Sequence, residues 1–147
     1  MREILFRGKS VTDGRWVFGD LSNYGDYKTI TTLKDFSIID SCEVIPETVG
    51  QYTGLKGKKN GKKIFEGDIL SIKCADGKSR LYPVYFGTYH VDGFGNNFHI
   101  GFYIKYFDED ISLGFLADSN DQTDFEAIGN IYDTPELLGG DKTRILI

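Results

Sequence analysis

Short stretches in which hydrophobic and polar residues alternate open the chain. Residues 3–7 alternate in this way, residues 15–18 do so again, and the pair Asp13-Gly14 stands between them. A period of two is typical of a strand with one buried face, because successive side chains point to opposite faces. Asp-Gly is a common turn between paired strands. The opening of the chain therefore predicts a β-hairpin.

Further runs of apolar, aromatic or β-branched residues predict more strands, since these side chains pack well on a pleated surface. The predicted strands cover residues 27–33, 36–39, 42–45, 69–74, 80–86, 98–107 and 125–131. Pro83 has no backbone N–H, which predicts an edge position or a bulge in its strand. Residues 87–97 are rich in glycine and asparagine and predict a loop. Thr134-Pro135 fits a helix start, and that helix can last barely one turn before Gly139.

Composition agrees with this pattern. The chain holds 18 glycines and 11 Phe, 9 Tyr and 1 Trp. Aromatic residues favour strands, and glycine supplies the positive φ angles of tight turns. With 40% hydrophobic and 27% charged residues, the chain can bury a core, which excludes a disordered protein. We predict a mainly β fold with minimal helix.

The charge is unevenly distributed along the chain. Residues 1–74 carry 12 Lys and Arg against 10 Asp and Glu, a net of +2, whereas residues 75–147 carry 5 against 12, a net of −7. The whole molecule has a net charge of −5 and so lacks the broad positive field of a general nucleic-acid binder. A local basic patch remains open.

Cysteine usage and hydropathy bear on the compartment. The two cysteines, Cys42 and Cys74, are too few for a disulfide scaffold, although one disulfide stays an alternative. No signal-peptide pattern opens the sequence, and no apolar run approaches the roughly 18 residues of a membrane helix. We expect a cytoplasmic protein with reduced thiols and no membrane contact.

Several long motifs resemble the YopX family of phage and prophage proteins. They lie in the opening residues 1–19, in Glu47–Leu55 continuing through Asn60–Ile69, and in Ile128–Leu138. The resemblance implies a phage or prophage origin and an SH3-like small barrel over roughly residues 63–133. It implies no assigned activity and no catalytic residues. The expected organisation is an N-terminal β subdomain (1–62), an SH3-like barrel subdomain (63–138) and a tail (139–147).

The two histidines, His90 and His99, are candidate metal ligands together with Asp92 or Cys74. Structural zinc needs four N or S ligands with close pair spacing, and no Cys-x-x-Cys or His-x-x-x-His pair exists here. We therefore predict ordinary loop and strand histidines, no metal site and no cofactor.

Three other patterns suggest catalysis, and each has a simpler interpretation. Glu66 and Asp68 are a possible acid–base pair, but acids flanking a turn glycine are more typical of capping. Cys42 or Cys74 with a histidine is a possible nucleophile pair, yet neither cysteine sits at a strand-to-helix elbow. Gly93-Phe94-Gly95 lacks the third glycine and the helix of a dinucleotide fingerprint. We predict that the protein is not an enzyme.

Two charged segments are candidate contact surfaces. A basic hairpin is predicted around Asn60-Gly61, and it comprises Lys56, Lys58, Lys59, Lys62 and Lys63. With Tyr52 and Phe65 as stacking aromatics, it is the possible nucleic-acid or partner contact. Residues 108–126 hold seven acids and predict a solvated loop. The alternatives are a docking site for a basic host protein or an imitation of nucleic acid.

These observations favour a non-catalytic protein-binding module as the function. Its partner is expected to be a host or phage protein or a second copy of the chain. The alternative is a nucleic-acid-binding protein that uses the lysine hairpin.

Overall fold

A computed structural model gives the protein's structure and describes residues 3–91, 97–107, 109–118, 124–139 and 144–146. Strands dominate these residues, which confirms the prediction of a mainly β fold with little helix. The chain divides into two compact units, Met1–Gly54 and Leu55–Ile147. Strand β5 (Gly50–Lys56) begins in the first unit and ends in the second. The predicted boundary between the subdomains lies at residues 62–63, whereas the two units divide after Gly54. The Asn60-Gly61 hairpin therefore belongs to the second unit.

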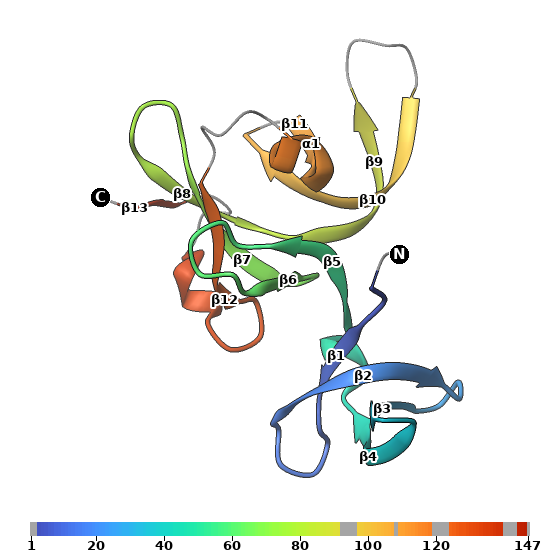
Figure 1. Cartoon of the computed structure of the whole chain (residues 1–147). Coiled ribbons are helices and arrows are strands. Elements are labelled where there is room, and N and C mark those ends of the chain that lie inside the picture. Colours follow the sequence, from blue (N-terminus) through green and yellow to red (C-terminus); the bar gives the residue numbers. More distant parts are fainter. Residues whose placement is uncertain (1–2, 92–96, 108, 119–123, 140–143, 147) are drawn as a thin grey trace. The chain divides into compact units, whose positions relative to one another are not determined.

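The first unit is an antiparallel meander that continues into β5 on the far side of β1 (Figure 1). Its strands are β1 (Phe6–Lys9), β2 (Trp16–Asn23), β3 (Lys28–Lys34) and β4 (Ser37–Val44). The pairing of Phe6 with Gly19 and of Lys9 with Trp16 confirms the predicted opening hairpin. The two runs predicted at 36–39 and 42–45 are wrong as separate strands, because β4 continues through the polar residues between them.

The first unit's sheet closes on itself. Ser10, after β1, forms a bridge with Val44 at the end of β4, and the Ile45 N–H donates to the Lys9 carbonyl (2.8 Å). Gly8 allows this approach, since a β-carbon there would lie 3.0 Å from the Val44 Cβ. Closure encloses a small apolar core of Val17, Ile30 and Val44, with Phe6, Leu21, Cys42 and Val49 packed against it.

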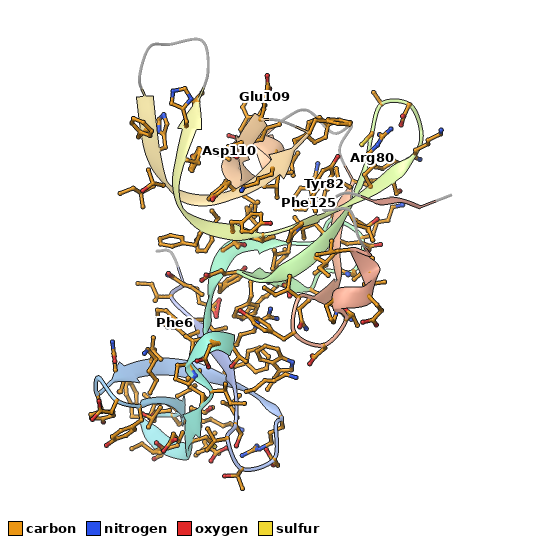
Figure 2. The ribbon with its side chains drawn as sticks, turned by 180° about the vertical axis from the view of Figure 1, so that it is seen from behind. Phe6, Arg80, Tyr82, Glu109, Asp110 and Phe125 are labelled. Atoms are coloured by element: carbon orange, nitrogen blue, oxygen red, sulfur yellow. The ribbon has the colours of Figure 1, made fainter. Side chains whose placement is uncertain are left out.

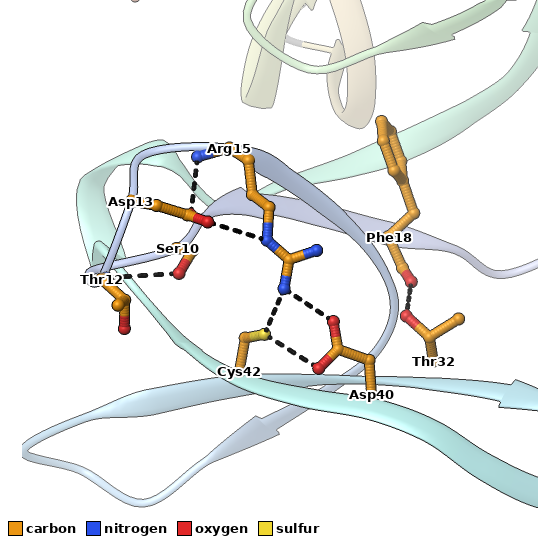
Figure 3. Close-up of polar contacts among 8 residues, drawn as sticks. All are labelled: Ser10, Thr12, Asp13, Arg15, Phe18, Thr32, Asp40 and Cys42. Atoms are coloured by element: carbon orange, nitrogen blue, oxygen red, sulfur yellow. Dashed lines mark hydrogen bonds and ion pairs between the residues drawn. The ribbon is translucent and has the colours of Figure 1, made fainter.

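An arginine links the first turn of this unit to β4 (Figure 3). The Arg15 guanidinium contacts Asp40 at 2.8 Å and Asp13 at 3.2 Å. The Cys42 thiol donates to the other Asp40 oxygen (3.3 Å). The hydrogen bond from Arg15 holds the pKa of Asp40 below its ordinary value. Because these side chains are largely exposed, the network orders the surface more than it stabilises the fold.

The second unit combines a four-stranded sheet, in the order β12-β7-β8-β13, with a three-stranded sheet, in the order β11-β10-β9. Its elements are β6 (Lys63–Phe65), β7 (Asp68–Lys73), β8 (Ser79–Pro83), β9 (Tyr85–Val91), β10 (Asn97–Tyr106), β11 (Glu109–Ser112), α1 (Leu113–Asp118), β12 (Phe125–Asn130), η2 (Pro135–Leu137) and β13 (Arg144–Leu146). One buried core joins both sheets to α1, and it contains Ile64, Leu70, Ile72, Tyr82, Val84, Ile104, Leu113, Leu116 and Phe125. An SH3-like barrel in this region stays a prediction.

The chain changes sheets at Pro83. β8 ends there, opposite Ile69, and β9 begins two residues later. Val84 between them donates its N–H to the Asp68 carbonyl and accepts from the Gly67 N–H, both at 2.9 Å. The strand predicted over residues 80–86 is thus two strands. Proline cannot donate to the ladder, which fits its place at a strand end.

Three other predictions differ from the structure. The loop predicted at 87–97 is wrong for residues 87–91, which belong to β9. The solvated loop predicted at 108–126 is wrong for residues 109–118, because Ile111, Leu113 and Leu116 pack on the core and order β11 and α1. Within the expected tail, β13 pairs with β8 (Figure 1).

Candidate functional site

A pocket of about 490 Å³ opens beside the three-stranded sheet of the second unit. The described residues that line it come from the β9–β10 hairpin, from β11 and from the first turn of α1. The lining residues are Tyr89, His90, Val91, His99, Glu109, Asp110, Ile111, Ser112 and Phe115. Ligand sites are typically concave and largely apolar, with a few polar groups that orient the ligand. This pocket has that character, and it is the candidate functional site.

An aromatic ladder on β9 and β10 forms one wall. The Tyr89 ring stacks on His99, with centroids 5.6 Å apart, and on Tyr103, at 5.1 Å. Gly87 pairs with Gly101 in the middle of the hairpin, and a β-carbon at Gly101 would lie 3.9 Å from the Tyr89 ring. The ring thus lies over the space beside Gly101, an arrangement known to support glycine in sheets. Tyr89 is buried and held in place as a rigid wall.

The rest of the described lining comes from β11 and from Phe115 of α1. The Phe115 N–H donates to the Ser112 hydroxyl (2.9 Å), which caps the first turn. Leu113 and Leu116 are buried in the core, so the helix is fixed against β10 and β11. Phe115 lies on the other side and is 68% exposed. A large apolar side chain held in the open on a fixed helix is suited to contact a ligand.

A second, smaller pocket of about 180 Å³ shares two residues with the first, Ile111 and Phe115. Its other lining residues are Ile72, Lys73, Cys74, Ala75, Tyr106 and Leu116. The two pockets are therefore neighbours on either side of the Phe115 side chain. Together they offer two adjoining depressions to an extended ligand.

The electrostatics of the larger pocket are negative. Glu109 and Asp110 line it at the start of β11, beside α1 (Figure 2). Across the described part of the chain, neither carboxylate forms an ion pair. Lys105 is the cross-strand neighbour of Asp110, but its ammonium group lies over the Tyr85 ring, 5.3 Å from the centroid. The described part of the lining contains no lysine or arginine.

The two histidines do not meet. His99 is paired with Tyr89 and stacks on it, whereas His90 is paired with Phe98 and contacts that ring edge-on at 5.3 Å. Because neighbouring residues of a strand face opposite ways, the two imidazoles belong to opposite faces of the hairpin. Among the residues that the structure describes, no group of three or more His, Cys, Asp or Glu could hold a metal ion. Asp92, the third candidate ligand, lies outside those residues.

The lysine hairpin is folded against β12. The Lys58 N–H donates to the Phe125 carbonyl (3.1 Å), and the Lys59 ammonium pairs with Asp124 at 3.5 Å. Lys56, Lys58, Lys59 and Lys62 are exposed and Lys63 is half-buried. Neither predicted stacking ring is available, since Tyr52 is 4% and Phe65 is 3% exposed. The hairpin thus has basic side chains without the aromatic platform expected of a single-strand binder.

The other catalytic candidates have structural surroundings. Asp68 is buried and its carboxylate accepts the Phe65 N–H (2.7 Å), which agrees with a turn-capping role. Cys74 lies beside the Tyr106 hydroxyl at 3.8 Å and Cys42 beside Asp40, so each thiol has a partner other than histidine. Residues 93–95, the glycine-rich candidate, lie outside the described residues.

Comparison with known proteins gives one match. A family model described as YopX protein matches residues 5–139, which is most of the chain. No curated protein and no solved structure matches it. No helix in the described part of the chain combines the length and the apolar character needed to cross a membrane.

Proposed function

The chain belongs to the YopX family, and we propose that it acts as a non-catalytic protein-binding module that receives a partner segment in the larger pocket. Three features that occur together at that pocket support this proposal. They are the wall formed by the buried Tyr89, the exposed Phe115 and the neighbouring second pocket. Fixed aromatic side chains supply much contact area at little cost in conformational entropy, which is why they dominate binding hot spots.

The proposal extends to the setting of the protein. The family resemblance suggests a phage- or prophage-encoded accessory protein that works in the bacterial host cytoplasm. Its partner is then a host or phage protein. The lysine hairpin as a nucleic-acid site is the weaker alternative, because Lys59 is paired with Asp124 and the aromatic rings nearby in sequence are buried.

Site-specific photocrosslinking tests the proposal. A benzophenone amino acid placed at Phe115 is irradiated in host cells that express the full chain. The matched control carries the same group at Tyr24, which lies in the first unit and is 59% exposed. We expect a discrete protein adduct from position 115 and none from position 24. Equal adducts from both positions, or none from position 115, would overturn the proposal.

A measurement of affinity then shows whether the crosslinked protein binds at Phe115 or was only close to it by chance. The captured partner is purified and titrated calorimetrically with the wild-type chain and with Phe115→Ala. Truncating an aromatic hot spot costs about 2 kcal/mol or more, which weakens binding by a factor of about thirty. An unchanged affinity would place the contact elsewhere.

A further inference from the structure

We infer that the two neighbouring pockets select a partner segment that presents an arginine or lysine side chain to the larger pocket and an apolar side chain to the smaller one. This inference rests on the proposed function, because it names the chemistry of the partner that the same site accepts. Its occupant is a basic segment of another protein.

Charge complementarity is the reason to expect a basic side chain in the larger pocket. Glu109 and Asp110 line the larger pocket without an ion-pair partner among the described residues, and no lysine or arginine is among the described residues of its lining. Both carboxylates add to the negative potential at the pocket, so a cation that approaches is attracted. The half of the chain that contains them has a net charge of −7. A basic side chain is therefore drawn to this pocket and an acidic one is repelled.

The exposed ring of Phe115 favours the same ligand, whereas Tyr89 is buried and already stacked on His99 and Tyr103. Tyr89 forms one wall and Phe115 stands at the boundary with the second pocket. A cation within about 6 Å of an aromatic ring face is attracted to it, and the attraction grows when water is displaced. An arginine has the planar group to stack on a ring while its N–H groups donate to a carboxylate.

The lining of the smaller pocket is the reason to expect an apolar side chain there. Its walls are mostly apolar, with Ile72, Ala75, Ile111 and Leu116 among them. Of the described residues that line it, Lys73 alone is charged, and a second basic side chain would be repelled there. The shared residue Phe115 sets the two depressions next to each other, so one short segment can fill both. The site thus discriminates between a basic–apolar pair and a run of basic residues.

Peptide display on the full chain tests this inference. A library of random heptapeptides is selected against the wild-type protein and against the double variant Glu109→Gln/Asp110→Asn. The control variant is Glu47→Gln, an exposed acid of the first unit. We expect the wild type and the control to enrich arginine or lysine adjacent to an apolar residue, and the double variant to lose that enrichment. Enrichment that ignores charge, or that survives in the double variant, would overturn the inference.

The strongest peptide is then titrated by fluorescence anisotropy. Replacing its basic residue by citrulline removes the charge and keeps the shape, and we expect at least a tenfold loss of affinity. Wild-type binding should weaken as salt rises, because the charges are partly exposed. Equal affinity for the citrulline peptide overturns the inference but leaves the proposed function standing if the crosslink from position 115 persists. Self-association of the wild type that Phe115→Ala abolishes in sedimentation would identify a second copy as the occupant and would also overturn it.

Discussion

The ring of Tyr132 covers Gly67 so closely that a β-carbon on that glycine would lie 3.1 Å from Cε2 of the ring. The Gly67 carbonyl also accepts the Ile131 N–H at 2.9 Å. Gly67 belongs to the turn before β7, and Tyr132 follows β12. Two segments that lie far apart in the sequence, and that both resemble the family, are therefore in direct contact.

Replacing Gly67 by alanine should destabilise the second unit for two reasons. Its φ of +88° costs a side chain about 1–2 kcal/mol, and the contact with Tyr132 should add about 1 kcal/mol or more. Gly61→Ala is the matched control, because its φ is +66° and nothing lies within 4 Å of the added carbon. Hydrogen exchange of β7 and β12 amides measures both losses. Equal losses in the two variants would mean that the Tyr132 contact carries no energy.

Asn130 organises the turn that holds Tyr132. Its side-chain oxygen accepts the N–H groups of Tyr132 (3.0 Å) and Asp133 (2.8 Å), and its amide donates to the Asp133 carboxylate (3.1 Å). The side chain is buried, so Asn130→Ala leaves backbone donors unsatisfied and should cost about 2–3 kcal/mol.

A surface asparagine provides the comparison for this variant. Asn23 makes one exposed bond, to the Gly25 N–H at 3.0 Å, and Asn23→Ala should cost less than about 1 kcal/mol. Hydrogen exchange in the affected unit again gives the free energies. A loss at Asn130 as small as that at Asn23 would contradict the role of the turn.

Phe36 is a destabilising residue at an exposed turn. The loop between β3 and β4 has Asp35 at φ +53° and Phe36 at φ +65°, and the Phe36 side chain is fully exposed. Such a two-residue turn favours Asn-Gly or Asp-Gly. Phe36→Gly should therefore stabilise the first unit by about 1 kcal/mol. Urea unfolding followed by the fluorescence of Trp16, the chain's one tryptophan, measures this, and a loss of stability would contradict the prediction.

The Cys42 thiol should react slowly. Burial raises its pKa above the ordinary value, and its hydrogen bond to Asp40 and the charge of that residue raise it further. Only the thiolate attacks an alkylating agent, so at pH 8 the reaction with iodoacetamide should be slower than for a free thiol. Asp40→Asn should accelerate it and Asp20→Asn, in the same unit, should not. Mass spectrometry of the Cys42 peptide gives the rates, and equal rates in the two variants would rule out the role of Asp40.

The local sequence pattern predicts an element correctly where the alternating residues are also the ones that the fold buries and exposes in turn. The opening hairpin alternates and turns at Asp13-Gly14, and it forms as predicted. Residues 87–91 of β9 differ from the predicted loop, because a glycine at position 87 is locally typical of a loop. The pairing of Gly87 with Gly101 of β10 places it in a strand. Helix α1 was missed because the acids around it hide a short apolar period that the core buries.

The candidate site was harder to predict for a related reason. The sequence marks Glu109 as one of a run of acids and His99 as a possible metal ligand. No local sequence feature places the two around one pocket with Phe115. Their meeting depends on pairing between strands, which the separate segments do not encode. The repeated spacing Gly87-x-Tyr89 and Gly101-x-Tyr103 is the one signal that could have indicated the aromatic wall.

A footprint of the bound partner shows whether the larger pocket is the binding site. The full chain, alone and saturated with the partner captured from position 115, is compared by hydrogen exchange and by NMR of its aromatic side chains. We expect protection and shift changes around Tyr89, His99 and Phe115, with the lysine hairpin at residues 56–63 unaffected. A footprint on that hairpin, with the pocket unchanged, would contradict it.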